Sequence, residues 1–165
     1  MDKITTGRRR FIEEMGDLID EHGLPRMAGR VVGALLTCSP PHMSLDELAD
    51  ALQASKGAIS MSTQLLLRLG IIDRISLAGH RRHYYQIRPR MGESLFFDRA
   101  DEIERHLAVI RRGIEQMKGG PIEAVRRLVE IQVFFEFVLE ELSGISTRWA
   151  KRCEQLLRHK LDEQS

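Results

Sequence analysis

Between positions 44 and 88 the spacing of apolar residues changes from a helical period to a strand period. Apolar residues first recur three or four positions apart over 45–52 and again over 56–69, which predicts two short helices. The runs 71–75 and 84–87 are then rich in β-branched and aromatic residues, which predicts a β-hairpin. This part of the chain therefore consists of two helices followed directly by two strands.

Local signals mark the ends of the two helices. Ser44 followed by Glu47 is a capping box, which predicts the start of the first helix. Ser55 is a good N-cap for the second helix, and Gly70 predicts its end. A helix, a turn, a second helix and a hairpin are the parts of a winged helix-turn-helix, in which the second helix lies in a DNA groove. We therefore expect a mainly α fold with a small β-hairpin wing.

The second helix has an outer face unlike that of an ordinary surface helix. No acidic residue occurs from Lys56 through Leu69. Small residues allow a helix to approach a groove closely, and Ser or Gln side chains can bond to base edges. The alternative is a surface helix of plain composition. The residues predicted on this face are Ala58, Ser60, Met61, Gln64 and Arg68.

The tip of the predicted hairpin, residues 77–82, is basic. His80, Arg81 and Arg82 follow the glycine of the turn, and His83 comes next. Arginine is the side chain most often found in the minor groove, so such a tip can contact phosphates or that groove. The alternative is a solvated charged turn, which the position directly after a helix-turn-helix makes less favourable.

The charge of the chain is small overall but unevenly distributed. The net charge is +1, which by itself indicates no particular partner. Residues 51–92 contain seven Lys or Arg and one acid, a balance of +6, whereas residues 1–50 have −3 and residues 93–165 have −2. Local positive charge attracts phosphates, so the second helix and the hairpin are the expected nucleic-acid surface.

Before this segment the pattern predicts two helices. Phe11, Met15, Leu18 and His22 are spaced for an amphipathic first helix, which begins near the basic cluster 8–10. That cluster could contact DNA, although a solvated basic terminus is the favoured interpretation. A second, mostly buried helix follows around Val31, Val32, Leu35 and Leu36 and ends before Pro40.

After the hairpin the apolar pattern becomes heptad-like. It predicts one helix up to the break at 119–121, a second over about 128–142, and a third after an interruption at Ser143 and Gly144. The apolar positions are Phe96, Ala100, Ile103, Leu107, Ile110, Ile114 and Met117, then Leu128, Ile131, Phe135, Val138 and Leu142, then Ile145, Trp149, Cys153 and Leu156.

Three helices with long apolar seams exceed what one small winged domain needs for its own core. Pairing with a second subunit is the natural use of this surplus, and a self-contained helical bundle in a monomer is the alternative. The expected organisation is an N-terminal supporting helix (1–22), a winged helix-turn-helix (23–92) and a helical dimerisation region (93–165). A C2 dimer would present two recognition helices to a pseudo-palindromic site, about 34 Å apart.

Five segments together resemble the MarR-like regulators of bacteria and archaea, most closely their GbsR branch. They are 23–30 (GLPRMAGR), 44–49 (SLDELA), 55–60 (SKGAIS), 69–74 (LGIIDR) and 79–85 (GHRRHYY). The helix-turn-helix alone is shared by many regulators, whereas the GLPRMAGR opening, the SKG helix start and the RRHYY wing are far more specific. The close resemblance covers roughly 20–92, and the flanks match in helical character only.

The resemblance implies a homodimeric transcription factor, usually a repressor, that binds double-stranded DNA. Its recognition helix would lie in the major groove and its wing beside the minor groove. MarR-like wings commonly carry an acid before the wing arginine, whereas this chain has His80 there. The DNA-binding residues implied are Ser55, Lys56 and Gly57 at the helix start, Ser60, Met61, Gln64 and Arg68 on the helix face, and His80, Arg81 and Arg82 on the wing.

The resemblance also implies a small-molecule effector. MarR-like regulators often bind one between the winged domain and the dimerisation helices. The GbsR branch includes choline and osmoprotectant sensors, which makes a quaternary ammonium one candidate, and such a cation is held in an aromatic cage. Phe134, Phe135, Phe137 and Trp149 supply aromatic rings. Helices carry phenylalanine for packing more often than for ligands, so the sequence assigns no ligand residues.

Other classes of function have little support in the residues. The chain has no phosphate-cradling glycine loop and no Gly-x-Ser-x-Gly motif, so we expect no enzyme and no cofactor. His80 and His83 lie among arginines that would repel a metal ion. For Cys38 we favour inert packing over a redox role, and with Cys153 it indicates no disulfide framework.

No stretch is long and apolar enough to span a membrane, and the N-terminal residues lack the apolar run of a signal peptide. A cytoplasmic protein is therefore expected.

The alternative to a DNA-binding regulator is a winged-helix module that binds protein without direct DNA readout. An acidic or apolar second helix would have favoured that alternative.

Overall fold

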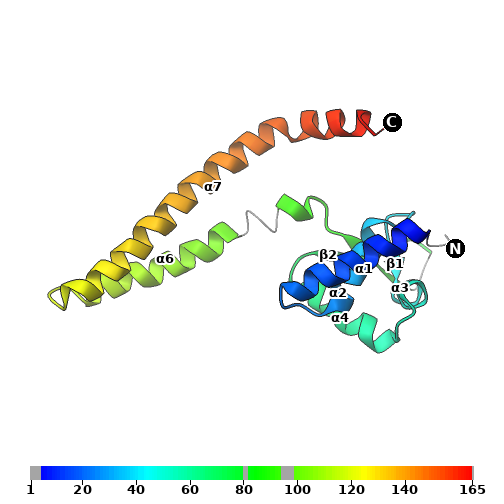
Figure 1. Cartoon of the computed structure of the whole chain (residues 1–165), viewed down its shortest axis with the longest axis horizontal. Helices are drawn as coiled ribbons and strands as arrows, with labels where there is room; N and C mark the ends of the chain where they lie inside the picture. The colour runs from blue at the N-terminus through cyan, green and yellow to red at the C-terminus, as the bar shows by residue number, and fades with distance from the viewer. Residues whose placement is uncertain (1–4, 80–81, 94–98, 165) are drawn as a thin grey trace. The chain divides into compact units, whose positions relative to one another are not determined.

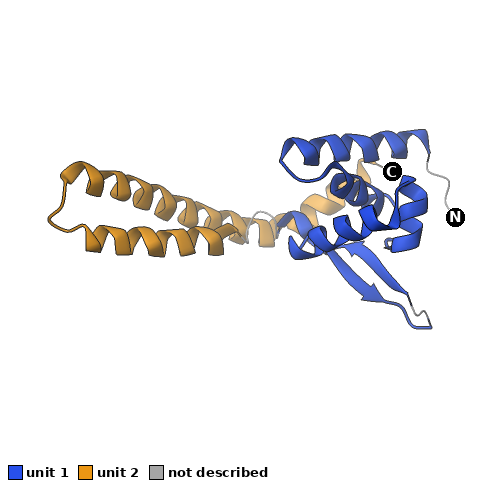
Figure 2. Ribbon diagram, turned by 90° about the horizontal axis from the view of Figure 1, so that it is seen from below, with its two compact units in different colours: residues 1–94 blue, residues 95–165 orange. Residues whose placement is uncertain are grey.

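The computed structural model describes residues 5–79, 82–93 and 99–164. The chain divides into two compact units, Met1–Ser94 and Leu95–Ser165, which Figure 2 shows in blue and orange. The first unit contains, in chain order, α1 (Thr6–Glu21), α2 (Arg26–Leu36), β1 (Met43–Ser44), α3 (Leu45–Leu52), α4 (Lys56–Arg68), β2 (Ile72–Ser76) and β3 (His83–Ile87) (Figure 1). The second contains α6 (Arg99–Gln116) and α7 (Ile122–Asp162).

Helix α2 forms the centre of the first unit, in contact with α1, α3, α4 and β3. Its apolar residues recur at helical spacing on more than one side, so almost the whole helix is buried. Ile59 and Leu66 of α4 and Ile72 of β2 complete the same core. The fully covered residues of α2 are Ala28, Val31 and Ala34.

Glycines allow α1 and α2 to pack with their backbones almost in contact. A methyl group added at Gly29 would lie 2.8 Å from Gly16 Cα and closer still to the carbonyl oxygen of Met15. Carbon atoms in contact normally lie about 3.5–4.0 Å apart, so no larger residue fits at Gly29 without separating the helices. This close packing holds α1 against α2, which also contacts α3 and α4.

The two arginines of the GLPRMAGR segment (23–30) form ion pairs between α1 and α2. Arg26 pairs with Asp17 and with Glu13, each at 2.7 Å, and these acids raise its pKa, the bond to Asp17 most. Arg30 pairs with Glu13 at 2.9 Å and donates to the carbonyl oxygen of Leu52 at 3.0 Å. This segment therefore joins α1, α2 and the end of α3.

The end signals predicted for the helix-turn-helix are confirmed. Ser44 Oγ accepts from the Glu47 amide at 3.3 Å, while Glu47 Oε2 accepts from the Ser44 amide at 2.7 Å. Ser55 Oγ caps α4 by accepting from the Ala58 amide at 3.2 Å. Gly70, just beyond α4, has φ +69°, the left-handed conformation that ends many helices.

The predicted hairpin is confirmed, and it carries a third strand that the sequence pattern does not indicate. β2 and β3 pair antiparallel, with Ile75 opposite Tyr84. The two-residue β1 pairs with the other edge of β3, with Ser44 opposite Tyr84, so the strand order is β1-β3-β2. The β2–β3 hairpin projects from the helices of the first unit (Figure 2).

The described residues of the second unit, 99–164, form two helices, α6 and α7, where the sequence pattern predicts three. The break after α6 is confirmed, with Gly119 at φ +82° and Pro121 at the start of α7. The predicted interruption at Ser143 and Gly144 is wrong, because α7 continues through both residues. One helical glycine costs only about 1 kcal/mol relative to alanine, which the long helix-forming flanks outweigh. Phe96, the first position of the predicted heptads, lies outside the described residues.

Candidate nucleic-acid interface

Helix α4 presents one exposed face, and the rest of the helix is held in the core. The exposed residues recur every three or four positions: Gly57, Met61, Gln64 and Arg68. Met61 is 74 % exposed, an unusual position for a large apolar side chain. The opposite face is anchored by Ile59, Ser62, Thr63 and Leu66, all buried.

The buried hydroxyls of α4 bond within the helix. Ser62 Oγ donates to the Ala58 carbonyl at 2.9 Å, and Thr63 Oγ1 donates to the Ser60 carbonyl at 3.0 Å. Both buried hydroxyls therefore have a hydrogen-bond acceptor, as buried polar groups require. The core side of α4 can therefore contain polar residues while the exposed side stays free for a partner.

Apart from Met61, the side chains on the exposed face are small or polar, and none of them is acidic. Gln64 Nε2 lies 3.5 Å from Ser60 Oγ, and Ser60 itself is half-buried. Arg68 stands at the last turn and has no side-chain partner within the described part of the chain. Hydroxyl and amide groups at these positions can both donate and accept hydrogen bonds, as base edges require.

The start of α4 combines outward amides with a cation. The first amides of a helix have no acceptor within it, so those of Lys56 and Gly57 are available to an anion. Ser55 is exposed, but its hydroxyl is engaged as the cap. Lys56 is 71 % exposed and pairs with Asp46 Oδ1 at 2.6 Å.

The wing is described on both sides of its tip. His80 and Arg81 lie outside the described residues. Arg82 is described: its side chain is 68 % exposed, and its Nη1 lies 3.7 Å from Asp46 Oδ2. His83 begins β3 as an exposed residue opposite Ser76.

Asp46 also belongs to this surface, although no sequence pattern predicts a role for it there. It lies in the first turn of α3 and contacts both Lys56 and Arg82. The hydrogen bond and charge of Lys56 lower the pKa of Asp46, and the charge of Arg82 acts in the same direction. No local pattern indicates this pairing, because it depends on the packing of α3 beside α4 and β3.

The basic residues of segment 51–92 differ in whether an acid lies beside them. Arg88 donates to Asp73 at 3.0 Å, so this arginine and the acid of the 51–92 segment pair with each other. Arg74 of β2 is exposed and has no side-chain partner among the residues described, although no sequence pattern predicts a role for it. Among the described cations of segment 51–92, Arg68 and Arg74 are therefore those without an acidic partner.

Two of the three arginines in the N-terminal basic cluster have partners within the first unit, whereas Arg9 is exposed. Arg8 Nε donates to Thr37 Oγ1 at 3.0 Å, which ties α1 to the end of α2. Arg10 pairs with Glu14 at 2.8 Å.

Cys38 follows the end of α2. Its Sγ donates to the Leu35 carbonyl at 3.3 Å, and burial raises the pKa of the thiol. The thiol therefore stays protonated and weakly nucleophilic.

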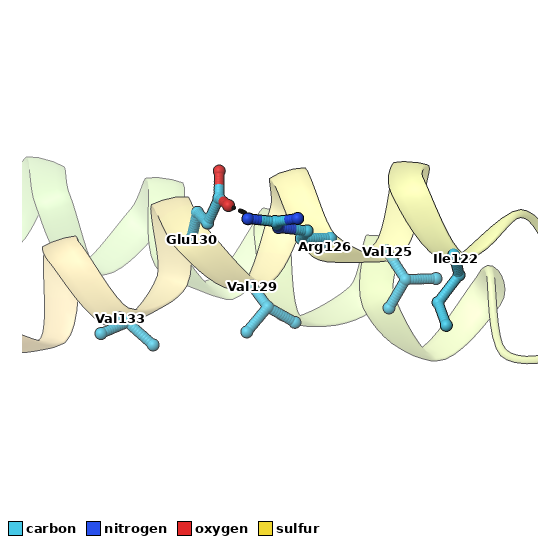
Figure 3. Close-up of a pocket in the computed structure, with 6 residues that line it drawn as sticks. All are labelled: Ile122, Val125, Arg126, Val129, Glu130 and Val133. Carbon is cyan, nitrogen blue, oxygen red and sulfur yellow. Dashed lines mark hydrogen bonds and ion pairs between the residues drawn. The ribbon is translucent and has the colours of Figure 1, made fainter.

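A second surface lies on α7, where apolar side chains face solvent. Ile122, Val125, Val129 and Val133 lie along one side of the helix and line a shallow groove of about 500 Å³, with the Arg126–Glu130 ion pair beside them (Figure 3). Ile122 is 81 % exposed and Val133 59 %. Contiguous apolar surface of this kind commonly marks a site of protein association.

Within the described residues, no helix is long and apolar enough to cross a membrane. No group of three or more His, Cys, Asp or Glu side chains in the described ranges could hold a metal ion.

Known proteins with similar sequences and folds identify the family. A sequence profile of the MarR family matches residues 22–83, and one described as MmpR5-like MarR family transcriptional regulator matches 91–152. The HTH-type transcriptional regulator MmpR5 of Mycobacterium tuberculosis is 32 % identical over 142 residues, 86 % of either chain. A crystal structure described as a transcriptional regulator is 32 % identical, covers 88 % of this chain and 99 % of its own, and has a TM-score of 0.76. From this identity and coverage, with the winged helix-turn-helix described above, the chain belongs to the MarR family of transcriptional regulators.

Proposed function

We propose that this regulator binds a pseudo-palindromic operator as a homodimer and represses transcription. Helix α4 would enter the major groove and the β2–β3 wing would lie beside the minor groove. Residues 23–92 would form the DNA-binding domain, 93–165 the dimerisation region, and 1–22 its support. Contact with the chromosome would place the protein in the cytoplasm.

The observation that carries this proposal is the exposed, acid-free face of α4 in a chain of this family. Met61 and Gln64 project from the middle of the helix, where they would meet base edges, with Ser60 beside them. The amides of Lys56 and Gly57 would bind a phosphate, and Ser55 would fix the helix start that presents them. Arg68, Arg81 and Arg82, with His80, would contact phosphates or the minor groove.

The unpartnered apolar surface of α7 supports the homodimer. Val133, Phe134 and Phe137 are each more than half exposed. Among the described residues of the second unit only Leu107 and Cys153 are buried, each 4 % exposed. Such a pair of helices is poorly stabilised alone, so a second copy that covers these side chains would complete its core.

Release by a small-molecule effector is the part of the proposal that rests on family resemblance. The resemblance to the GbsR branch, and with it a quaternary ammonium effector, stays a prediction. Among the aromatic residues considered for a cage, Phe134 and Phe135 have ring centroids 6.2 Å apart at a 46° tilt. This contact is typical of packed rings, and we propose no ligand residues.

Two substitutions separate base readout from phosphate contact. Gln64→Ala should reduce the preference for a selected duplex over a scrambled one by about tenfold, the worth of one good base contact. Arg82→Ala should weaken binding to both duplexes and flatten the slope of log affinity against log salt by about 0.9. The measurement is a fluorescence-anisotropy titration at several salt concentrations, with a duplex selected by the wild-type protein from a random library.

Gln155→Ala, an exposed amide on α7, is the control and should change neither property. Equal effects of Gln64→Ala and Arg82→Ala would count against the assignment of the helix face. Failure of the wild-type protein to bind any duplex at low salt would reject the proposal. That result would favour the protein-interaction module instead.

Gly57 offers a test of close backbone approach. A methyl group added there would meet nothing nearer than Ser55 Oγ at 4.0 Å, so the fold tolerates alanine. Gly57→Ala should raise the free energy of unfolding by up to about 1 kcal/mol. DNA affinity should nevertheless fall about tenfold, because the methyl group would hold the backbone amide away from its phosphate. The control for binding is Gly7→Ala, which also adds a methyl group in open space near a helix start. Unchanged or tighter DNA binding by Gly57→Ala would exclude a close approach of the α4 backbone to a phosphate.

A further inference from the structure

We propose that Asp46 is a positioning residue that fixes Lys56 of α4 and Arg82 of the wing relative to one another, and so increases the sequence specificity of DNA binding. The inference rests on the proposed DNA-binding function and extends it to a residue outside the recognition helix and the wing.

Asp46 uses one carboxylate oxygen for each partner. Oδ1 lies 2.6 Å from Lys56 Nζ, and Oδ2 lies 3.7 Å from Arg82 Nη1. The three residues belong to α3, to the first position of α4 and to the segment that enters β3. One side chain therefore connects the two parts that would contact DNA.

The sheet explains how Asp46 comes to lie beside the wing. Ser44 is opposite Tyr84 in the β1–β3 pair. Asp46 is two residues after Ser44, and Arg82 is two residues before Tyr84, so antiparallel pairing brings the two positions toward each other. Ser44 is also the cap of α3, which fixes the first turn of that helix to the same strand.

A role in helix stability alone does not explain these contacts. An acid in the first turn stabilises a helix through the helix dipole without any need to contact cations on two other elements. Ion pairs as exposed as these contribute little to folding, since solvent screens them and the side chains lose rotamer freedom. Asp46 lies between two cations that are each about 70 % exposed. Its role is therefore better explained by the DNA phosphates that these cations would bind.

A carboxylate on this surface should affect specific and non-specific binding differently. Non-specific affinity depends mainly on the number of cations that neutralise phosphates, and an acid lowers it. Specific binding also requires the cations to stand where the operator places its phosphates, and holding two long side chains in place reduces their loss of freedom on binding. Asp46 should therefore weaken non-specific binding more than specific binding.

The test compares Asp46→Asn with Asp50→Asn. Asp50 lies one helical turn further along α3, is exposed and has no side-chain partner among the other described residues, so its substitution removes the same charge without removing a bridge. Affinity is measured for the selected duplex and for a scrambled duplex of equal composition, at one salt concentration. Asp46→Asn should lower the ratio of the two affinities about tenfold, with tighter binding to the scrambled duplex, whereas Asp50→Asn should leave the ratio within about twofold.

Equal changes for the two variants would show a bulk charge effect and overturn the proposal, as would an unchanged ratio for Asp46→Asn. In a Lys56→Gln/Arg82→Gln background, Asp46→Asn should no longer change the ratio; a retained effect would also contradict it. A carboxyl NMR titration without DNA supplies an independent readout. Lys56→Gln and Arg82→Gln should each raise the pKa of Asp46, and no change with either would show that the bridge does not form in solution.

The measurements distinguish a protein that does not bind DNA from one in which Asp46 has no positioning role. If the wild-type protein binds neither duplex, the specificity role is rejected together with DNA binding, while the titration still reports whether Asp46 contacts both cations. If the wild-type protein discriminates normally but Asp46→Asn behaves like Asp50→Asn, DNA binding stands and the positioning role alone is rejected.

Discussion

Replacement of Gly29 by alanine should lower the free energy of unfolding by about 3 kcal/mol, the upper part of the range for overpacked cores. The added methyl group would meet the Met15 carbonyl oxygen and Gly16 Cα, which are backbone atoms of α1. A side chain can rotate away from a clash, but these atoms can move only if α1 moves off α2. The measurement is urea unfolding followed by circular dichroism at fixed protein concentration, because dimerisation would also contribute to stability.

Gly7→Ala is the matched control for Gly29→Ala. A methyl group there has nothing within 4 Å, and alanine favours the helix, so stability should stay the same or rise slightly. For a chain of this size the loss at Gly29 corresponds to a fall in melting temperature of about 10 °C. A shift at Gly29 no larger than that at Gly7 would show that the two helices do not pack this closely in solution.

The second large effect is expected on α7, where Val133→Asp should convert the proposed dimer to a monomer. Val133 is 59 % exposed in the single chain, so aspartate is tolerated there until a second subunit covers the site. Burying an unpaired carboxylate is strongly unfavourable. Loss of pairing would also remove the gain from binding two half-sites at once, so operator affinity should fall by about 100-fold or more. Sedimentation equilibrium and anisotropy titration measure the two effects.

Val133→Leu keeps an apolar side chain at the same position and should remain dimeric with normal affinity. Val129→Asp combined with Val133→Asp places two charges in the groove and provides a stronger form of the test. Circular dichroism below the melting temperature should show folded helices in all three variants, with a lower melting temperature for the two aspartate variants because their second unit loses its partner. A dimer that survives the double substitution would place the subunit interface elsewhere on the chain.

The parts of the fold that the sequence predicts well are those determined by neighbouring residues. The capping box of Ser44 and Glu47 and the cap at Ser55 require only a few consecutive residues, and both form as expected. Of the five residues predicted on the outer face of α4, Met61, Gln64 and Arg68 are exposed, whereas Ala58 and Ser60 are half-buried. The hairpin strands and the break between α6 and α7 are further cases, with Gly119 and Pro121 as the local signals of the break.

The parts that could not be predicted depend on contacts between distant residues or on cooperativity. Strand β1 has two residues and exists only because β3 lies beside it. The bridge from Asp46 to Lys56 and Arg82 joins elements that only the folded unit brings together. Gly144 is a local signal for a break, but the helices on both sides of it are long enough to continue through it.

The uninterrupted course of α7 also sets a constraint on how this chain can change in length. In a continuous helix each inserted residue turns everything beyond it by about 100° and advances it by about 1.5 Å. One extra residue near Gly144 would therefore move Cys153 and Trp149 to a different angular phase from Leu128 and Phe135. Seven extra residues would restore that phase to within about 20°. A flexible joint at Gly144 would have absorbed any insertion, whereas the rigid helix admits only those that complete whole turns.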